Sequence, residues 1–430
     1  MKYLYKKSIL IMCLVILLTI TFCPNFVFAD EVSSISINSP SAILIDSYTN
    51  KVLYEKNSNE RRYPASITKV MTAIIVLEKC SLDEVATVSP EAVLEIGPGY
   101  VSANLQVGEN FTIEQLLNVL MVASSNDAAI VLAEHISGSV EEFSVLMNEK
   151  AKELGCLDTN FINPNGVHSQ NHYSTAYDLA LIGSYAMKNE TFRNIVAKTS
   201  YSLPATSEYP VEDRYFTTTN SLIIVNNNQR ADNYYYKYAT GIKTGFTTPA
   251  GNCLIASSKK DNFELITVVL GAPETKNGLS GRFVDTISLF DYGYDTYNIK
   301  EILKQGTIVQ TYNVKGASKD TKRLDIVVED TVSVLTKKST SSENFLPEVK
   351  INENLKAPIK KNDVIGTITY VVEDITYTEN LIANSDVKPS KWFFTIIEII
   401  FIILIILTIL KIRLINKKKK RLKLKNKMRH

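Results

Sequence analysis

One apolar run near the C-terminus constrains this 430-residue chain more than any other feature. Trp392 to Leu410 carries a single acid, Glu398, and is long enough to cross a bilayer as a helix. The tail after it, residues 411–430, holds eleven lysines or arginines, which favours the cytoplasmic side of a membrane. Nucleic-acid binding is the alternative for the tail, but the adjacent span accounts for its charge. We therefore expect a membrane anchor, no nucleic-acid partner, and a folded part outside the cytoplasm.

The N-terminus has the layout of a secretory signal peptide. Lysines at positions 2, 6 and 7 precede an apolar run over residues 9–20, and Val27-Phe28-Ala29 offers a small-x-small cleavage site. Residues 1–29 are therefore predicted to be removed, with an uncleaved anchor as the alternative. Both ends of the chain agree in placing the folded part outside the cytoplasm.

The central part of the chain reads as strands at both ends with helices between them. A strand hairpin is expected at residues 41–54, and three strands at 239–247, 250–256 and 263–270. Helical spacing of apolar residues is found at 112–120, 143–154, 174–187 and 282–292. This order predicts one mixed α/β domain over residues 38–295, whose sheet unites its two ends.

A second domain is expected after Tyr297. Short β-rich runs alternate there with polar turns, at residues 308–312, 324–328, 331–335, 348–351 and 364–371. The pattern predicts a small all-β domain over residues 298–380, without a cluster of chemically reactive side chains. Residues 381–391 read as a polar linker to the span at 392–410.

Cysteine usage indicates neither a disulfide scaffold nor a metal site. Cys80, Cys156 and Cys253 remain after removal of the signal peptide, and three thiols cannot all pair. Their spacing forms no Cys-x-x-Cys or Cys/His cluster of the kind that binds zinc. We expect buried free thiols, no metal and no cofactor.

Ser66 and Lys69 lie at the start of a predicted helix. Pro64 suits a first helical turn, and the apolar run 70–77 follows. Residues three apart share a helix face. A lysine whose pKa is lowered by burial or by neighbouring charges can take the proton of a serine nucleophile. The free N–H groups of a helix start can also stabilise an oxyanion.

Two later patches belong with this pair. Ser124-x-Asn126 falls on the connection between two apolar helices. Lys243-Thr244-Gly245 lies in a β-prone run broken by glycines, and glycine in a strand often marks close approach of a ligand or another backbone. Ser-x-x-Lys and Ser-x-Asn also occur elsewhere in the chain, so neither pattern carries the interpretation alone.

The order of the three patches resembles the active-site triplet of the penicillin-binding proteins and serine β-lactamases. Longer stretches are similar to the low-molecular-mass D-alanyl-D-alanine carboxypeptidases, at residues 64–73, 125–129, 161–166 and 241–247. The resemblance covers about residues 38–295. It implies a β-lactamase/transpeptidase-like α/β fold, an antiparallel sheet with a helical cluster. The β-rich region and the anchor also resemble those that many of these enzymes carry.

The resemblance implies a role for each residue. Ser66 would attack the carbonyl between two terminal D-alanines, and Lys69 would take its proton. Lys243, a second cation, would hold Lys69 partly neutral by like-charge repulsion. Ser124 would relay a proton to the departing D-alanine, and Asn126 would bind the backbone amide of the substrate.

The remaining implied roles concern the terminal carboxylate and the oxyanion. Thr244, helped by Lys243 and followed by Gly245, would bind the carboxylate. The backbone N–H groups of Ser66 and Phe246 would form the oxyanion hole. Arg282 either adds a charge for the carboxylate or forms a surface salt bridge, and the sequence favours neither.

The expected function is that of a serine-type carboxypeptidase that trims D-alanine from peptidoglycan pentapeptide stems. β-Lactams would acylate Ser66 as mimics of D-alanyl-D-alanine. A β-lactamase is one alternative, but class A enzymes use a glutamate between their second and third motifs, and the chain has none between Leu154 and Asn189. A catalytically idle penicillin-binding scaffold is the other, against which the intact motif residues argue.

Overall fold

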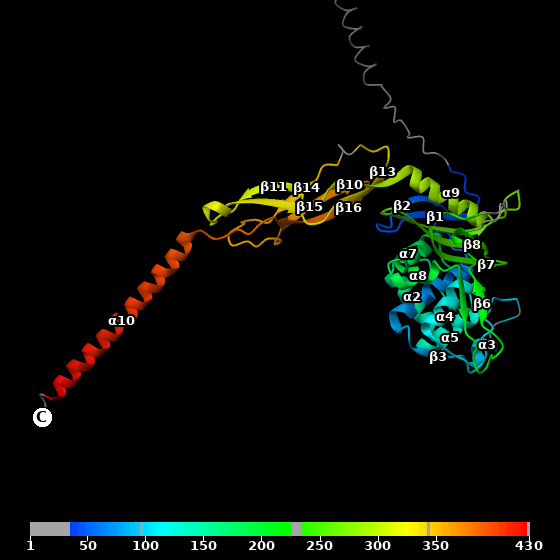
Figure 1. Ribbon diagram of the computed structural model, residues 1–430, viewed down its shortest axis with the longest axis horizontal. Helices are drawn as coiled ribbons and strands as arrows, with labels where there is room; N and C mark the ends of the chain where they lie inside the picture. Colours follow the sequence, from blue (N-terminus) through cyan, green and yellow to red (C-terminus); the bar gives the residue numbers. More distant parts are fainter. Residues whose placement is uncertain (1–34, 95–96, 98, 226–233, 342–344, 428–430) are drawn as a thin grey trace, which may run out of the picture. The chain divides into compact units, whose positions relative to one another are not determined.

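The computed structural model describes residues 35–427 except 95–96, 98, 226–233 and 342–344. The predicted signal peptide, residues 1–29, lies outside the described residues. The described residues from Asn38 onward form one compact unit. Within it, an α/β domain is followed by an all-β domain and a long C-terminal helix (Figure 1).

A five-stranded antiparallel sheet joins the two ends of the α/β domain, as the sequence predicts. Its order is β2-β1-β9-β8-β7. The bounds are β1 Ser41–Asp46, β2 Val52–Lys56, β7 Ala239–Thr247, β8 Gly251–Lys260 and β9 Phe263–Ala272. β1 pairs with β9 across more than 200 residues of chain, for example Ala42 with Val269. The strand β7, which carries the Lys-Thr-Gly patch, therefore lies at one edge of the sheet.

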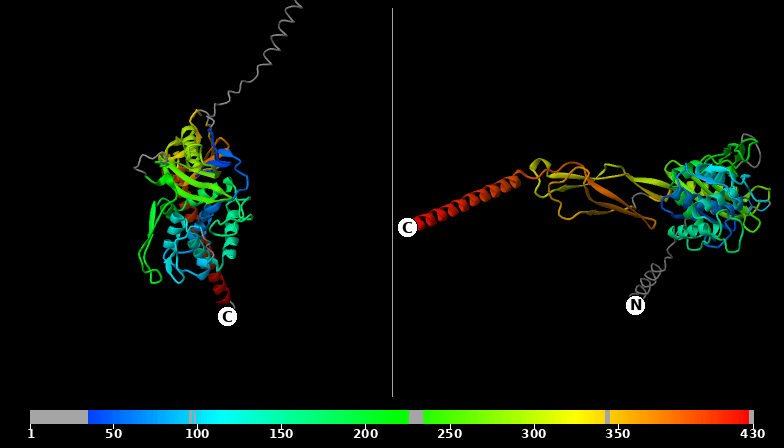
Figure 2. Two further views of the ribbon diagram at one scale, coloured as in Figure 1. Left: turned by 90° about the vertical axis from the view of Figure 1, so that its right-hand side faces the viewer. Right: turned by 90° about the horizontal axis from the view of Figure 1, so that it is seen from below.

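Helices cover both faces of this sheet. α9 (Gly281–Thr296) packs against β8 and β9 on one face, and α7 (Ala176–Ala186) packs against β1, β8 and β9 on the other. Figures 1 and 2 show α7 grouped with the other helices of the cluster. The cluster contains α2 Lys69–Lys79, α4 Ile113–Asn118, α5 Asn126–Ser137, α6 Val140–Glu153 and α8 Glu190–Val196.

The helix α2 is the centre of the core. Every residue from Lys69 to Val76 is buried, so this part of the helix is enclosed on all sides rather than being amphipathic. It contacts α5, α6, α7 and α8. Because the start of α2 is fixed by this packing, the residues just before it are held in place against the sheet.

The local structure around Ser66 differs from the predicted α-helical turn. Residues Ala65–Thr68 form a 3-10 turn, η1, and α2 begins only at Lys69. Thr112 caps α4 as expected, and its side chain and that of Gln115 form a reciprocal capping box. Helical spacing alone does not distinguish a tight 3-10 turn from the first turn of an α-helix.

The all-β domain contains the expected short strands and two that the sequence pattern missed. Its main sheet has the order β11-β12-β16-β15-β14, and β10 pairs with β13 in a second sheet. The bounds are β10 Tyr297–Leu303, β11 Ile308–Asn313, β12 Arg323–Val328, β13 Val332–Lys337, β14 Glu348–Ile351, β15 Val364–Val372 and β16 Ile375–Ala383. β16 covers the first residues of the predicted linker, so that prediction is wrong for residues 381–383.

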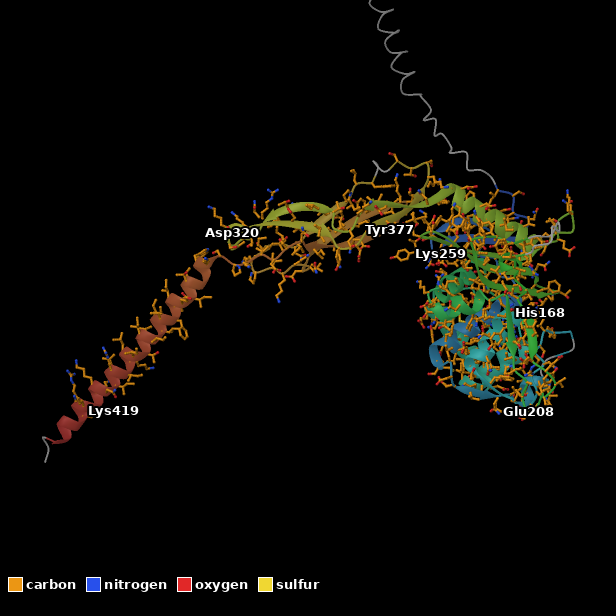
Figure 3. The ribbon with its side chains drawn as sticks, in the orientation of Figure 1. His168, Glu208, Lys259, Asp320, Tyr377 and Lys419 are labelled. Carbon is orange, nitrogen blue, oxygen red and sulfur yellow. The ribbon has the colours of Figure 1, made fainter. Side chains whose placement is uncertain are left out.

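A single helix, α10, ends the described chain at Lys391–Lys427. Its apolar part lies within Thr395–Leu422, is long enough to cross a membrane, and has side chains that are not buried within the protein. The basic residues continue the same helix, and Figure 3 labels Lys419 among them. The helix fits a membrane anchor.

Candidate active site

Ser66 and Lys69 form a hydrogen-bonded pair, as their spacing predicts. Lys69 Nζ donates to Ser66 Oγ at 3.1 Å. The same nitrogen also donates to Asn126 Oδ1 at 2.6 Å and to the carbonyl of Asn165 at 2.7 Å. Lys69 is completely buried. Its amine is therefore fixed by three partners, one of which is the serine hydroxyl.

The surroundings of Lys69 favour its neutral form. Burial, and secondly the positive charge of Lys243, hold the pKa of Lys69 well below its ordinary value of 10.5. Lys243 is itself buried, and burial followed by the charge of Arg282 lowers the pKa of Lys243 to about 7. A neutral amine within hydrogen-bond reach of a hydroxyl can act as a general base.

The β7 strand approaches η1 at Gly245. A Cβ atom at this position would lie 3.0 Å from the carbonyl oxygen of Pro64 and 3.1 Å from the backbone nitrogen of Ser66. Only glycine allows this distance without displacing one backbone. The Lys243-Thr244-Gly245 segment therefore lies beside Ser66, although nearly 180 residues separate them in the sequence.

Ser124 and Asn126 reach the same site from a segment with an unusual backbone conformation. Residues Val119–Ala123 form a π-helical turn, η2, and Ser124 follows in a left-handed conformation with φ of 64°. α5 then begins at Asn126 with Ser125 as its cap. π-helical segments often occur at functional sites. Ser124 and Asn126 thus reach the cleft from a helix junction.

Asp127, which the sequence analysis did not single out, fixes this junction to the neighbouring loop. Its carboxylate is buried and accepts hydrogen bonds from the backbone N–H groups of Ala103 at 3.0 Å and Leu105 at 3.1 Å. The backbone N–H of Asn126 donates to the carbonyl of Val101 at 3.0 Å. The loop that carries Val101 is therefore tied to the start of α5.

A second loop closes the site around Lys69. Gly166 has φ of +80°, and a Cβ there would lie 1.9 Å from the carbonyl oxygen of Ala65. Thr72 Oγ1 donates to the carbonyl of Pro164 at 2.6 Å. Residues 160–173 are a loop, as the sequence predicts, but nothing in the sequence points to Asn165, whose carbonyl accepts from Lys69. Because every residue has a backbone carbonyl, this contact cannot be predicted from the type of residue at position 165.

These segments surround one cleft of about 240 Å³. The predicted site residues that line it are Ser66, Ser124, Asn126, Thr244, Gly245, Phe246 and Arg282. The buried Lys69 and Lys243 lie behind this lining. The cleft is also lined by Gly99, Tyr100, Val101, Asn165, Gly166, Val167, Thr219 and Thr247, which the sequence analysis did not assign to it.

Thr219 and Arg282 complete the side of the cleft near β7. The hydroxyls of Thr219 and Thr244 are hydrogen-bonded to each other. Arg282 Nη1 donates to the carbonyl of Gly245 at 3.3 Å, and Arg282 Nε is buried without a hydrogen-bond partner. Among the described residues, Arg282 forms no ion pair. Its guanidinium is a cation that faces the cleft, rather than part of a surface salt bridge.

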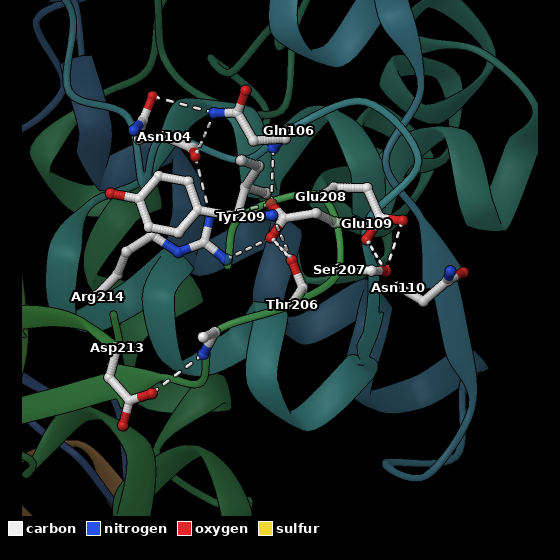
Figure 4. Close-up of polar contacts among 12 residues, drawn as sticks. Asn104, Gln106, Glu109, Asn110, Thr206, Ser207, Glu208, Tyr209, Asp213 and Arg214 are labelled. Atoms are coloured by element: carbon white, nitrogen blue, oxygen red, sulfur yellow. Dashed lines mark hydrogen bonds and ion pairs between the residues drawn. The ribbon is translucent and has the colours of Figure 1, made fainter. Parts of the chain in front are cut away.

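The outer wall of the cleft is braced by a buried ion pair. Arg214, in β6 (Arg214–Thr217), binds both carboxylate oxygens of Glu109 at 2.7 and 2.9 Å (Figure 4). It also donates to the carbonyl of Asn104 at 2.9 Å, and Thr206 donates to Glu109. The hairpin that leads to Thr219 is thereby joined to the loop that carries Tyr100 and Val101.

Three features surround one cleft: a serine hydroxyl hydrogen-bonded to a buried lysine, a Ser-x-Asn segment at a helix junction, and a Lys-Thr-Gly segment on the edge strand. Together they define the class of penicillin-recognising serine enzymes. The family model for D-alanyl-D-alanine carboxypeptidases, peptidase S11, matches residues 28–274. A model of the C-terminal domain of penicillin-binding protein 5 matches residues 297–389. The chain belongs to the S11 family of serine-type D-alanyl-D-alanine carboxypeptidases.

Individual relatives agree with this assignment. The chain is 32% identical over 401 residues to D-alanyl-D-alanine carboxypeptidase DacF of Bacillus subtilis, covering 91% of this chain and 97% of that protein. The structure resembles penicillin-binding protein 5 of Haemophilus influenzae, with a TM-score of 0.61 and 27% identity, over 83% of this chain and 99% of that one. It also resembles PBP3 of Streptococcus pneumoniae, a peptidoglycan synthesis regulatory factor, with a TM-score of 0.67 and 25% identity over 82% and 100%.

Proposed function

We propose that this chain removes the terminal D-alanine from peptidoglycan stem pentapeptides through an acyl-enzyme on Ser66. The family acts on D-alanyl-D-alanine peptides and binds β-lactams. The observation that carries the assignment to these residues is the 3.1 Å hydrogen bond between a fully buried Lys69 and Ser66. In the proposal, Lys69 removes the hydroxyl proton as Ser66 attacks the carbonyl carbon.

The proposed roles of the other residues follow from their places in the cleft. Asn126 hydrogen-bonds the backbone amide of the stem peptide, while Ser124 passes a proton to the departing D-alanine. The backbone N–H groups of Ser66 and Phe246 stabilise the oxyanion, a contribution worth about 100- to 1000-fold in rate for one donor. Water then releases the shortened peptide from the enzyme.

The free carboxylate of the substrate is proposed to bind at the β7 side. Thr244 supplies a hydroxyl, and Lys243 lies buried next to it. The guanidinium of Arg282 lowers the pKa of Lys243 and makes no ion pair among the described residues, so a carboxylate between them would satisfy both cations. This arrangement selects a peptide with a free C-terminus and therefore a carboxypeptidase substrate.

Penicillin is proposed to inhibit the enzyme rather than to be hydrolysed. A β-lactam would acylate Ser66 and leave only when a water is activated. Neither a glutamate nor an aspartate lines the cleft in the part of the chain that the structure describes. The acyl-enzyme therefore lacks the carboxylate base that class A β-lactamases use, and slow release is expected.

The chain is proposed to be a single-pass membrane protein whose enzyme domain lies outside the cytoplasm. The proposed organisation is a signal peptide at 1–29, the catalytic domain at 38–295, the β domain at 298–380, the span at 392–410 and a cytoplasmic tail at 411–430. The support is the apolar helix and the eleven basic residues after it.

Two substrates distinguish this function from its alternatives. D-Alanine release from diacetyl-lysyl-D-alanyl-D-alanine is expected from the native chain and is expected to disappear in Ser66→Ala. An idle penicillin-binding scaffold would be labelled by fluorescent penicillin without releasing D-alanine. A β-lactamase would turn over nitrocefin continuously, whereas an inhibited carboxypeptidase is expected to open about one nitrocefin per enzyme and then keep it as the acyl group on Ser66.

A further inference from the structure

Three metal-ligating side chains meet on the catalytic domain at the ends of its two central helices. Cys80 is the C-cap residue of α2, His135 lies in the last turn of α5, and Glu84 immediately precedes β3 (Val85–Thr87). Their ligand atoms all lie within 4.8 Å of one another. His135 Nε2 and Glu84 Oε2 are 3.3 Å apart. None of the three belongs to the catalytic cleft.

We propose that Cys80, Glu84 and His135 form a zinc-binding site. Zinc prefers thiolate, imidazole and carboxylate ligands in tetrahedral geometry, and three protein ligands leave a fourth position for water. The spacing of Cys80, Cys156 and Cys253 predicts no metal, because they form no Cys-x-x-Cys or Cys/His cluster, and His135 lies 55 residues after Cys80. The fold brings these ligands together.

The backbone around the three ligands is already fixed by hydrogen bonds. The N–H of Cys80 donates to Val76 at 3.0 Å, and the carbonyl of Glu84 accepts from Ile113 at 2.8 Å. The N–H of Ser81 donates to Glu84 Oε1 at 2.5 Å, which orients the carboxylate so that Oε2 faces His135. Hydrogen bonds of this kind, made to a ligand side chain by a neighbouring group, hold the ligand in the orientation that a metal needs.

The charges at this place also suit a divalent cation. α2 and α5 both end here, and helix C-termini carry partial negative charge. A Cys80 thiolate and the Glu84 carboxylate neutralise Zn²⁺, with the thiol proton released to solvent on binding. Lys79 opposes binding, but it is exposed and its flexible side chain can turn to solvent. Cys80 is only half-buried, so solvent ions can reach it.

Metal binding at this site would act on the catalytic domain as a whole. α2 begins at Lys69 and α5 begins at Asn126, so one ion would join the far ends of the two helices that start in the cleft. A ligand that binds only the folded state stabilises it. Zn²⁺ at about 100 times its dissociation constant is expected to raise the melting temperature by about 5 °C.

Cobalt provides the direct test, because Co²⁺ replaces Zn²⁺ and reports its ligands by absorption. The reduced, detergent-solubilised full chain is titrated with Co²⁺ and then with Zn²⁺. We expect a thiolate-to-cobalt charge-transfer band with tetrahedral d–d bands, and their loss on adding Zn²⁺. Cys80→Ser should abolish the charge-transfer band, and His135→Ala and Glu84→Gln should each weaken Co²⁺ binding at least 10-fold.

Asp83→Asn is the matched control, since it removes an exposed carboxylate adjacent to Glu84 without removing a ligand. It should bind Co²⁺ like the native chain, and all four variants should retain labelling by fluorescent penicillin, which shows that they are folded. A native chain without the charge-transfer band, a band that survives Cys80→Ser, or equal weakening by Asp83→Asn and Glu84→Gln would overturn the proposal.

Discussion

At the scale of single residues, the site depends on Lys69, whose surroundings disfavour its protonated form. Lys69 has three polar contacts but no carboxylate partner among its hydrogen bonds, and it lies near a second buried lysine. Burial of the ammonium and the charge of Lys243 outweigh the opposing attraction of the Asp127 carboxylate, so the proton is given up below the ordinary lysine range. The same environment that would destabilise a structural lysine supplies a base below the pH at which an ordinary lysine loses its proton.

This electrostatic account predicts how the pH profile of penicillin acylation responds to Lys243. Protonated Lys69 cannot act as a base, so acylation rises with pH as Lys69 loses its proton. Lys243→Gln removes the neighbouring positive charge, raises the pKa of Lys69 and moves this rise to higher pH. Because burial is the larger cause of the lowered pKa, the profile should not move fully to 10.5.

Lys243→Arg is the matched control for this measurement. It keeps a positive charge beside Lys69, so the rising part of the profile should stay near its native position even if the rate falls. Acylation rates with fluorescent penicillin between pH 5 and about 10 cover the range over which a perturbed lysine titrates. An unchanged profile in Lys243→Gln would show that Lys243 does not set the charge of Lys69.

The close contact at Gly245 gives a second prediction at this scale. Gly245→Ala would bring a Cβ within 3.1 Å of the Ser66 nitrogen, so β7 and η1 must separate by a few tenths of an ångström. We expect penicillin acylation to slow by about 10-fold, because catalytic geometry tolerates little misplacement. The melting temperature should change little. Native acylation by this variant would contradict the account of the glycine.

At the scale of secondary-structure elements, the sequence is most informative where apolar spacing is regular. The strands 263–270 and the capped helix after Thr112 could be predicted from residue pattern alone. The hairpin of β5 (Ser200–Leu203) and β6 could not, because each strand is only 4 residues long and the two charges of its buried ion pair are residue types usually found at the surface. Burial of a charge depends on its partner, and Glu109 is 105 residues before Arg214.

The motif residues of the site could be predicted because their side chains carry the chemistry. Their convergence around one cleft was an inference from the order of three patterns, and the structure brings them together. Asn165 and Asp127 could not be predicted in the same way. One acts through its carbonyl and the other through hydrogen bonds to a loop backbone, so both roles depend on tertiary contacts.

Removing one charge of the buried ion pair between Glu109 and Arg214 is expected to lower the stability of the fold strongly. Glu109→Gln leaves the guanidinium of Arg214 buried without a carboxylate, and loss of one partner of such a pair typically costs about 3–5 kcal/mol. Chemical denaturation should show this loss in the free energy of unfolding. The double variant Glu109→Gln/Arg214→Met should lose less than the sum of the two single variants. Strictly additive losses would contradict coupling between the two side chains.

At the scale of the whole molecule, the chain combines an enzyme domain, a β domain and a membrane-compatible helix. The helix has no buried apolar window, so it contributes nothing to the core of either domain. Removal of residues 391–430 is therefore expected to release the protein from the membrane fraction. Its rate of penicillin acylation should remain within about 2-fold of the native rate, because no described residue of α10 lines the cleft and changes at the surface usually affect stability little.

The matched control for the anchor keeps α10 but replaces the lysines at 417–420 with glutamine. Because the apolar part of the helix is intact, this variant should still sediment with membranes. Sedimentation of the shortened protein with membranes would show that another part of the chain holds it there.

The central claim is that Ser66 is the acylated nucleophile and Lys69 its base. Mass spectrometry of the penicillin-treated full chain, followed by peptide mapping, tests it most directly. We expect one penicilloyl adduct on the peptide that contains Ser66, no adduct in Ser66→Ala, and much slower formation in Lys69→Met. An adduct on Ser124, or one that persists in Ser66→Ala, would contradict the account.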